Sequence, residues 1–373
     1  MRIAWFGHAS GGRADGLSAY SDSIVTALSD RGITTQFFSH QGDGTVAPSP
    51  DHVQLSAYRF KTVTVSLPGS LARVEHELDR FRPDIVHVSI SFSLLEAAIR
   101  KVAARRGIPA VATVHLPYAA SSSARGRVLR GLYRFHARHL AQFDRCIALS
   151  DEQRRLLVDC GCSAERVEVI PNGIDVAAIR PAPEDAPPRD DDALTVVYIG
   201  RLDPEKRVAA LVRSFVGLGW PRQRELIIAG TGSQARRIRR LAEGHPNVRV
   251  LGMVSDSTAR LELLQRADII VLPSTAEGLS LSLLEAMSAG AAVIATSAGE
   301  DGAALGDAGV LLPVYPLEPA LSDALRRLGD DRALRAALGR RARARVEKHY
   351  ALRSNVDRLA GVYAGLSQRH AAA

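Results

Sequence analysis

The sequence predicts an α/β fold made of two doubly wound, Rossmann-like domains. Short runs rich in β-branched and other apolar residues alternate with amphipathic stretches along both halves of the chain. Such alternation is typical of parallel sheets that carry helices on both faces. A segment rich in proline and charge, residues 180–193, separates the halves, and 373 residues exceed the size of one typical hydrophobic core. We therefore expect two domains.

The first half, residues 1–179, contains the runs expected to form the strands of one sheet. In chain order they are RIAWFG, ITTQFF, DIVHVS, PAVATVH, RCIALS and VEVIPN. After the first run, an apolar stripe at helical spacing predicts a helix; its members are Leu17, Tyr20, Ile24, Ala27 and Leu28. Ser150 and Gln153 form a capping box that opens the helix after RCIALS.

The second half, residues 194–350, repeats the pattern after the linker 180–193, which has no apolar period. Its runs are LTVVYIG, ELIIAG, NVRVLG, DIIVLPS and AAVIATS. Residues 351–373 keep an apolar stripe and predict a C-terminal helix that packs back across the domains; the stripe is Leu352, Val356, Leu359, Tyr363 and Leu366. Ligands of such sheets bind at the carboxyl ends of the strands, so we expect the two domains to face each other across an active-site cleft.

The composition excludes several classes of protein. A hydrophobic fraction of 46% with 24% charged residues is typical of a globular chain and disfavours disorder. The net charge is +8, but only four of the 48 basic residues are lysines, which indicates a coding bias and weakens a nucleic-acid interpretation. The three cysteines provide neither a disulfide framework nor a zinc site.

The sequence also bears on location. No run reaches the roughly 18 to 20 apolar residues that a membrane span requires, and the beginning, MRIAWFGHASGG, resembles a first strand more than a signal peptide. We expect a cytoplasmic protein. The arginine-rich stretch from Arg125 to Arg145 would suit an amphipathic helix on anionic lipid, so peripheral contact with the inner membrane face is an alternative. A helix with its arginines in solvent and its apolar side on the sheet is the favoured account.

Two carboxylates in residues 277–290, EGLSLSLLEAMSAG, are the first candidate site residues. Glu277 lies in the loop after an apolar run, and Glu285 lies on the helix that follows. The stretch Gly278 to Ser282 carries no acidic side chain, so we expect free backbone N–H groups and the helix dipole to be available to a phosphate. An acid on each side of a phosphate suggests a nucleotide-sugar. A solvent-exposed helix acid and an unrelated loop acid are the alternative.

Cations follow the first run of the second half. Arg201 comes directly after LTVVYIG, and Asp203 with Pro204 predicts the N-cap and first position of a helix. Lys206 then falls in the first turn, where a cation opposes the helix dipole at a cost of about 0.3 to 1 kcal/mol. A bound pyrophosphate would relieve that cost. Screening by Glu205 and solvent is the alternative.

Glycines follow other strand runs. Gly230 and Gly232, in AGTGS at residues 229–233, predict a turn where the backbone approaches a ligand closely. Gly16 belongs to a loop after the first run, but SGGRADG is not G-x-G-x-x-G, and no acidic residue ends the second run. These departures disfavour an NAD-dependent oxidoreductase.

Two histidines and one acidic cluster complete the candidates. His115 closes PAVATVH at its carboxyl end, where its side chain can reach a cleft, although a structural role is about as well supported. His87 lies within DIVHVS and is expected to be buried. Asp190, Asp191 and Asp192 lie in the linker and are expected to be solvated charge. We predict no metal site.

Together, these stretches resemble the retaining glycosyltransferases of the GT-B fold, specifically glycosyltransferase family four (glycosyl transferases group 1). The matching segments are TVHLPY at 113–118, IPNGID at 170–175, GRLDPEK at 200–206, IAGTGS at 228–233 and ADIIVLPSTAEGLSLSLLEAMSAG at 267–290. The resemblance covers nearly the whole chain. It implies an acceptor-binding N-terminal domain and a donor-binding C-terminal domain.

The resemblance implies a role for each candidate residue. Arg201 and Lys206 would bind the donor diphosphate. Glu285 would hold the ribose hydroxyls, and Glu277 would face the transferred sugar. His115 would contact the donor sugar from the N-terminal side. The remaining donor-binding positions are the backbone N–H groups of Gly278, Leu279 and Ser280, the glycines Gly230 and Gly232, and Val254 near the base. Gly16 would belong to the loop that makes acceptor-side contacts.

The sequence departs from the family pattern in the N-terminal glycine loop, and it leaves the identity of the donor base open. Gly16 matches the second glycine of the family's N-terminal Gly-Gly loop, whereas Asp15 stands where the first is usual. Met253, Val254 and Asp256 lie where the base is expected to stack, and an aspartate would suit guanine.

The expected activity is metal-independent transfer of a hexosyl unit, with retention, from a UDP-sugar and without a cofactor. The acceptor would be a carbohydrate, a lipid-linked sugar or a small natural product. The alternatives are a GDP-sugar (mannosyl) transferase, a sugar-nucleotide epimerase or phosphorylase, and a catalytically degenerate sugar-nucleotide-binding protein. Nucleic-acid binding is disfavoured because aromatic residues do not interleave the arginines.

Overall fold

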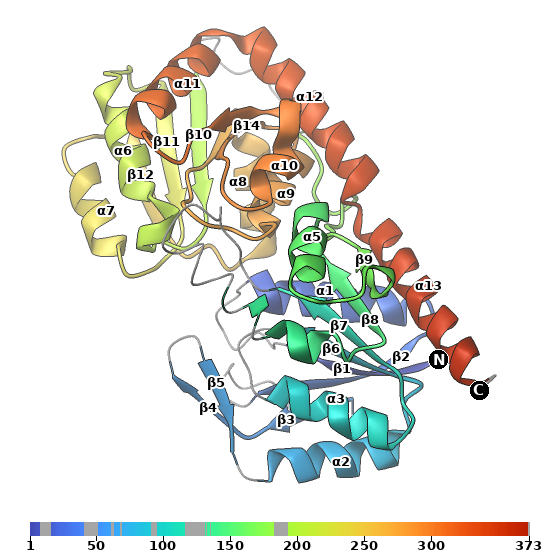
Figure 1. Cartoon of the computed structure of the whole chain (residues 1–373). Helices are drawn as coiled ribbons and strands as arrows, with labels where there is room; N and C mark the ends of the chain where they lie inside the picture. Colours follow the sequence, from blue (N-terminus) through green and yellow to red (C-terminus); the bar gives the residue numbers. More distant parts are fainter. Residues whose placement is uncertain are drawn as a thin grey trace. The chain divides into compact units, whose positions relative to one another are not determined.

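A computed structural model describes the chain in two compact units (Figure 1). One unit is Met1–Gly173 with Leu352–Ala373, and the other is Ile174–Ala351. The structure describes residues 1–7, 16–40, 51–60, 63–67, 69–90, 95–115, 131, 133–134, 136–182 and 193–371; for residues 16–19, 57–60, 63–66 and 371 it describes the backbone alone. The domain boundaries expected at 179, 193 and 350 stay predictions, and most of the expected linker, at 183–192, lies outside the described residues.

The first unit is built on a seven-stranded parallel sheet in the order β3-β2-β1-β6-β7-β8-β9. Each apolar run of the first half forms one of these strands, while β3 and the separate antiparallel hairpin of β4 and β5 were not expected. Each of these three strands is only four residues long, which is too short to show a clear hydrophobic period. The strands are β1 (Arg2–Phe6), β2 (Thr34–His40), β3 (His52–Leu55), β4 (Ala57–Phe60), β5 (Val63–Ser66), β6 (Ile85–Ile90), β7 (Ala110–Val114), β8 (Arg145–Ala148) and β9 (Val167–Val169).

Helices cover both faces of this sheet. One face packs on α1 (Gly16–Ser29) and α13 (Leu352–Ala371), and the other on α2 (Ser70–Phe81), α3 (Leu95–Arg105) and α5 (Asp151–Asp159). The C-terminal stripe of α13 is buried against the α1 stripe within the first unit, and the expected packing across both domains stays a prediction. The buried members described are Tyr20, Ile24, Ala27 and Leu28 of α1, and Val356, Leu359, Tyr363 and Leu366 of α13.

Local signals near α5 are confirmed. The Ser150 hydroxyl accepts a hydrogen bond from the Gln153 N–H at 3.0 Å. The Gln153 side chain returns to accept from the Leu149 N–H at 2.7 Å. This reciprocal bonding satisfies donors that the start of a helix leaves without intrahelical partners. After the turn η1 (Ala164–Arg166), the chain enters the edge strand β9.

The second unit is built on a six-stranded parallel sheet in the order β12-β11-β10-β13-β14-β15. Its central strands read as continuous apolar runs because helices bury both of their faces. The strands are β10 (Leu194–Ile199), β11 (Arg224–Ala229), β12 (Val248–Gly252), β13 (Ile269–Leu272), β14 (Ala292–Thr296) and β15 (Val310–Leu312). Only β15, three residues long, was not expected.

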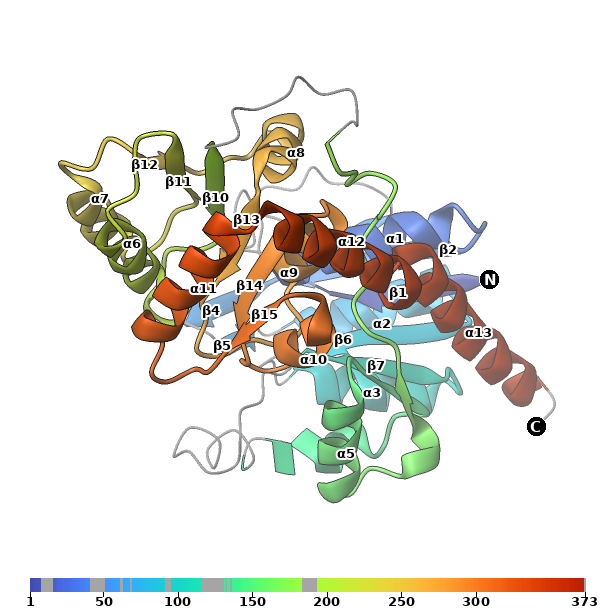
Figure 2. The ribbon, with the colours of Figure 1, turned by 90° about the horizontal axis from the view of Figure 1, so that it is seen from above.

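Helices lie on both faces of this sheet (Figure 2), and each face carries its own hydrophobic core. One core packs α6 (Val208–Gly217), α7 (Ala235–Ala242) and α11 (Glu318–Asp330). The other packs α8 (Ser257–Arg266), α9 (Leu281–Ser288), α10 (Asp301–Leu305) and α12 (Arg332–His349). The short turns η2 (Pro204–Lys206) and η3 (Gly306–Ala308) complete the unit.

Candidate active site

The candidate donor residues of the second unit gather where its strand order reverses. The sheet runs outward in chain order from β10 to β11 and β12 on one side, and from β13 to β15 on the other. The loops after β10 and β13 therefore leave neighbouring strands at the same edge and diverge. In open α/β sheets this switch point is where ligands bind. Arg201 and Lys206 follow β10, and Glu277 follows β13.

Lys206 and Glu277 form an ion pair across these two loops. The Lys206 ammonium donates to Oε1 of Glu277, although the residues are 71 positions apart. Their side chains are only 17% and 14% exposed, so little water screens the pair. The Thr275 N–H donates to the carbonyl of Glu205 at 2.8 Å and fastens the two loops together. The structure thus brings together two residues chosen separately from the sequence.

Arg201 and Asp203 link the loops after β10 and β11. The guanidinium of Arg201 pairs with Asp203, and at 2.9 Å with Glu205. Asp203 Oδ1 also accepts from the N–H and the hydroxyl of Ser233, both at 2.9 Å. These hydrogen bonds from Ser233, together with Arg201, hold the pKa of Asp203 below its usual range. Lys206 and Arg201, the two cations selected from the sequence, thus both have carboxylate partners.

A helical turn starts after Asp203 as expected, but it is a 3-10 turn and not an α-helix. Asp203 and Pro204 precede the single 3-10 turn η2, and the Asp203 side chain makes no cap hydrogen bond because Ser233 and Arg201 engage it. The α-helix begins only at Val208, after Arg207 in the left-handed region at φ 52°. Lys206 therefore ends η2, so the expected conflict with an α-helix dipole does not arise.

Glu285 of α9 pairs with Arg260 of α8. The Arg260 guanidinium donates to Oε2 of Glu285, and the two side chains are 30% and 18% exposed. Sequence reasoning selected Glu285 but missed Arg260, because arginine is common in this chain and the two residues lie 25 positions apart. Asp256, considered for guanine, instead caps α8 by accepting from the Ala259 N–H at 2.7 Å. Val254 is half-buried beside it, and Met253 is 52% exposed.

The loop from Glu277 to Ser280 leads into α9. Ser280 is the N-cap, and its hydroxyl accepts from the Leu283 N–H at 3.1 Å. The expectation of a free amide at Ser280 was wrong, because the Ser280 N–H donates to Oδ1 of Asp301 at 2.8 Å. The hydroxyl of Ser280 also donates to Oδ2 of Asp301 at 2.9 Å. Asp301 was not selected from the sequence, since nothing in its local pattern marks it.

Two buried acids follow β14. Burial, and then the charge of Glu277, raise the pKa of Asp301 to about 8. Burial also raises the pKa of Glu300 to about 7. A carboxyl that loses water of solvation holds its proton more tightly. Asp301 therefore lies under the Glu277 loop mainly as a neutral acid near pH 7.

The glycines after β10 and β11 serve loop packing. Gly230 has φ +149°, and a Cβ there would lie 1.8 Å from the Gly200 carbonyl oxygen. At Gly232 a Cβ would lie 2.6 Å from the Leu202 backbone. Any larger residue would force these two loops apart. Ligand contact by Gly230 and Gly232 stays a prediction, whereas their close approach to the preceding loop is observed.

His115 and Gly16 belong to the first unit. The His115 N–H donates to the Ile90 carbonyl at 3.2 Å, and its half-buried ring meets Tyr20 edge-on with centroids 4.5 Å apart. Gly16 is the first residue of α1, and the loop before it, with Asp15, lies outside the described residues. The expected contact of His115 with the donor sugar and the expected acceptor-side role of the Gly16 loop stay predictions.

His87 is buried, as expected. It is 0% exposed and stacks on Trp5 with ring centroids 3.9 Å apart. Thr113 Oγ1 lies 3.0 Å from Nε2, and the Tyr363 hydroxyl lies 2.8 Å from Nδ1. Burial lowers the pKa of His87 well below its usual range, and the imidazole is a neutral part of the core.

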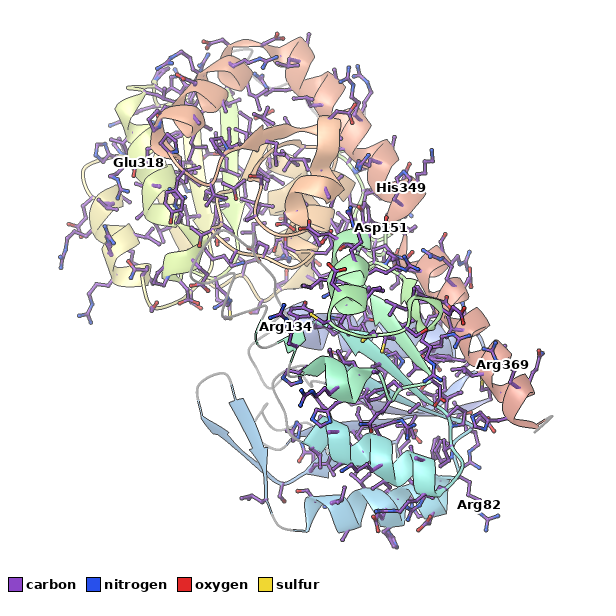
Figure 3. The ribbon with its side chains drawn as sticks, in the orientation of Figure 1. Arg82, Arg134, Asp151, Glu318, His349 and Arg369 are labelled. Carbon is purple, nitrogen blue, oxygen red and sulfur yellow. The ribbon has the colours of Figure 1, made fainter. Side chains whose placement is uncertain are left out.

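The arginine-rich segment is described only in part. Residues 116–130 lie outside the described part, whereas Tyr133, Ala137 and Leu140 are buried in the core of the first unit. Arg134, labelled in Figure 3, and Arg138 are exposed. The described residues thus fit the solvated helix with its apolar side on the sheet. Asp190, Asp191 and Asp192 lie outside the described residues.

Two features are absent from the residues that the structure describes. No three His, Cys, Asp or Glu side chains among them are arranged to hold a metal ion. Within the described part of the chain, no helix has both the length and the apolar character to cross a bilayer.

Comparison with known families matches both halves of the chain. Residues 14–178 match the model of Glycosyltransferase Family 4, and residues 193–331 match Glycosyl transferases group 1. The chain is 31% identical to the phosphatidyl-myo-inositol mannosyltransferase of Mycolicibacterium smegmatis, over 82% of this chain and 80% of that one. The chain belongs to glycosyltransferase family 4. A second member, the D-inositol 3-phosphate glycosyltransferase of Kineococcus radiotolerans, is 28% identical over 90% and 87% of the two chains.

Solved structures agree on the fold of this glycosyltransferase. Sucrose-phosphate synthase from Thermosynechococcus elongatus aligns with a TM-score of 0.77 at 20% identity, covering 100% of both chains. The Anabaena protein HepE in complex with UDP aligns with a TM-score of 0.73 at 17% identity, covering 98% of this chain and 100% of that one. The two Rossmann-like units are those of a GT-B enzyme.

Proposed function

We propose that this glycosyltransferase moves a hexosyl unit, with retention at the anomeric carbon, from a nucleotide-sugar to an acceptor hydroxyl. The observation that carries the proposal is the ion pair of Lys206 with Glu277 at the switch point of the second sheet. A cation suited to phosphate beside an acid suited to sugar hydroxyls supports the proposal. Family membership supports glycosyl transfer independently of this geometry.

Lys206 and Arg201 are proposed to bind the donor diphosphate. Both cations have carboxylate partners in the structure, so an incoming diphosphate would compete with Glu277 for Lys206 and with Asp203 and Glu205 for Arg201. Released from Lys206, the Glu277 carboxylate can accept hydrogen bonds from sugar hydroxyls. The ion pair would thus keep both groups ordered until the donor arrives.

Glu285 is proposed to hold the ribose hydroxyls. Arg260 engages Oε2 of Glu285, and the carboxylate retains further acceptor sites for hydroxyl donors. The amides of Gly278 and Leu279 are proposed to meet the sugar and phosphate, as the family resemblance implies. Because the Ser280 amide is engaged by Asp301, Ser280 is proposed to act through the loop conformation.

In the reaction, the bond from the anomeric carbon to the diphosphate breaks as the bond to the acceptor oxygen forms on the same face. Negative charge develops on the departing diphosphate, and fixed cations there lower the barrier. Lys206 and Arg201 are proposed to supply this charge in place of a metal ion. The acceptor proton passes to the departing phosphate, and His115 is proposed to contact the donor sugar.

A UDP-sugar is the favoured donor. Solved relatives of the same fold are complexes with UDP and with UDP-glucose. A GDP-linked mannosyl donor is the second candidate, because the M. smegmatis relative is a mannosyltransferase. The names of two relatives contain inositol, so inositol phosphates and phosphatidylinositol join carbohydrates, lipid-linked sugars and small natural products as candidate acceptors. A lipid acceptor would require peripheral contact with a membrane.

Hydrolysis of nucleotide-sugars tests the proposal directly. UDP- and GDP-sugars are incubated with the protein, with and without EDTA and with each acceptor class, and released nucleotide and product mass are measured. We expect release of one nucleotide that EDTA does not suppress, and NMR of the product should show the donor's anomeric configuration. Strict dependence on a divalent metal would refute metal independence. Binding of nucleotide without turnover under any condition would favour the degenerate binding protein.

A further inference from the structure

The turn between β14 and α10 contacts both ends of the Glu277 loop, residues 277–280. This turn, residues 297–301, lies beside the loop because β14 is the neighbour of β13 in the sheet. At the base of the loop, the Thr296 hydroxyl donates to the Ser274 carbonyl at 2.5 Å. The loop that presents Glu277 is therefore held by a second segment of the chain.

Gly299 makes the contact at the first end. It lies in the left-handed region at φ +56°, and a Cβ there would fall 1.8 Å from the carbonyl oxygen of Glu277. Only glycine permits this approach without displacing one backbone from the other. The backbone of Glu277 thus rests directly on the turn.

Asp301 makes the contact at the second end. It is 3% exposed, and its two oxygens bind the N–H and the hydroxyl of Ser280 at 2.8 and 2.9 Å. The same hydroxyl caps α9 through the Leu283 N–H. One side chain therefore sets both the end of the loop and the first turn of the helix.

We propose that Asp301 is a positioning residue for glycosyl transfer: by engaging Ser280 at two points, it holds Glu277 and the start of α9 in the arrangement that turnover requires. This inference rests on the proposed function of the same site. Asp301 does not touch the reacting atoms, and Glu277 and Lys206 are the charged groups that act on it. Its removal should disturb the alignment of the sugar more than the affinity for the nucleotide.

Asparagine is a close mimic of Asp301 in its neutral form. The raised pKa means that the carboxyl carries one acceptor oxygen and one O–H group near pH 7. The amide oxygen can accept from the Ser280 N–H as Oδ1 does, and the NH2 group can meet the Ser280 hydroxyl once that hydroxyl turns to accept instead of donating to Oδ2. Alanine removes both contacts. Comparing Asp301→Asn with Asp301→Ala therefore separates hydrogen-bonded positioning from charge.

The experiment measures donor hydrolysis and nucleotide binding in the full-length wild type and variants. For Asp301→Ala we expect kcat to fall roughly 10- to 100-fold, since a misplacement of about 1 Å costs about that much. Its Kd for UDP, or for GDP where the wild type prefers it, should stay within about threefold, with full binding stoichiometry. Asp301→Asn should restore kcat to within about threefold of the wild type.

Asp331→Ala is the matched control. Asp331 is an exposed aspartate that caps α12 by accepting from the Leu334 N–H at 2.8 Å, and its loss removes a similar helix-start contact elsewhere in the second unit. This variant should retain wild-type kcat. A loss of kcat in Asp331→Ala equal to that in Asp301→Ala would overturn the inference, because destabilisation alone would then explain both.

Two further results would overturn the inference while leaving the proposed function intact. One is an Asp301→Ala enzyme with wild-type kcat, and the other is an Asp301→Asn enzyme as impaired as Asp301→Ala. Failure of the proposed function is distinguishable, because the wild type itself would then neither bind a nucleoside diphosphate nor hydrolyse a nucleotide-sugar.

Discussion

The two Rossmann-like units arrange their strands alike but use polar side chains differently. In the first sheet, β1 lies between β2 and β6. In the second sheet, β10 lies between β11 and β13 in the same way, so the strand order reverses at the first strand of each sheet. In the second unit, ion pairs join the loops at this point, as Lys206 and Glu277 show. In the first unit, residues 8–15 and 91–94 after β1 and β6 lie outside the described residues, and within these strands His87 is stacked on Trp5 and bonded to Tyr363.

The comparison sets a partly exposed, charged site in the second unit against a buried, neutral network in the first. Strand order determines where a ligand can bind, but side chains determine what binds there. Partly exposed ion pairs can exchange partners with a charged ligand, whereas a buried neutral network resists change. We expect substitutions in the second unit's ion pairs to alter catalysis, and substitutions in the His87 network to alter stability.

The largest expected effect is that of Lys206→Ala. Loss of the cation should lower kcat by roughly 10²- to 10³-fold, the size of effect seen when one group that stabilises developing charge is removed. The fold should persist, since Lys206 pairs with a loop residue that lies outside the two hydrophobic cores of the second unit. Nucleotide release and the circular-dichroism melting curve measure the two effects. Lys348→Ala, which removes an exposed lysine of α12, is the control, and an unchanged rate in Lys206→Ala would refute the phosphate role.

Glu277→Gln should have the second largest effect and lower kcat by roughly 10²-fold. The amide keeps the shape of the side chain but loses the charge that strengthens hydrogen bonds from sugar hydroxyls. Calorimetric titration with UDP should give a nearly unchanged Kd, since UDP carries no sugar to be transferred. Glu347→Gln, which changes an exposed carboxylate of α12 that pairs with Arg343, is the control. A parallel loss of UDP affinity would show that Glu277 acts on the nucleotide instead.

Glu285→Gln should act on affinity and spare turnover. Weakening a charged hydrogen bond to ribose should raise the Kd for nucleotide about tenfold, since such bonds contribute about 1.5 to 3 kcal/mol. The value of kcat at saturating donor should stay within about threefold. Arg260→Ala sharpens the test, because it frees Glu285 from its ion pair without removing the carboxylate. Equal affinity in wild type and Glu285→Gln would contradict the ribose role.

The pH dependence of stability should change in Asp301→Asn. The pKa of Asp301 is about 8 in the folded protein, whereas the ordinary value for an aspartate is 3.8. Between these two values, the folded state retains a proton that the unfolded state has lost. Wild-type stability therefore falls as pH rises from about 4 to 8. The melting temperature of the variant relative to wild type should rise by several degrees over this range, since about 1 kcal/mol shifts it by about 2–4 °C. A difference independent of pH would contradict this assignment.

The smallest effect is expected in the first unit, from Tyr363→Phe. Removing the hydroxyl that bonds Nδ1 of His87 should lower the free energy of unfolding by about 1–2 kcal/mol. Turnover at a temperature below the transition should be unchanged. Urea titration and the hydrolysis assay measure the two quantities. A lower kcat in fully folded Tyr363→Phe would contradict the expectation that the His87 network affects stability and not catalysis.

Much of the fold followed from local patterns. Every strand assigned to an apolar run formed, and the Ser150–Gln153 cap formed as expected. The missed strands β3 and β15 are three or four residues long, too short to show a period. The α-helix expected after Asp203 starts instead at Val208, because Ser233 and Arg201 occupy the Asp203 carboxylate.

The site was predicted less completely. Lys206, Glu277 and Glu285 were selected by motif, but their partners were not all found. Arg260 lies 25 positions before Glu285, and Asp301 lies 21 positions after Ser280. No local pattern connects residues so far apart, because their contact depends on how α8 and the turn after β14 pack against α9.

By itself, the sequence determined the alternation of strands and helices and the motif residues of family 4. These depend on hydrophobic period, turn chemistry and residue identity, which are local properties. Only the tertiary structure decided which charges neutralise one another and which amide Asp301 engages. The physical reason is that ion pairs and buried hydrogen bonds depend on distance and burial, and strand order sets both by bringing distant loops to one edge of the sheet.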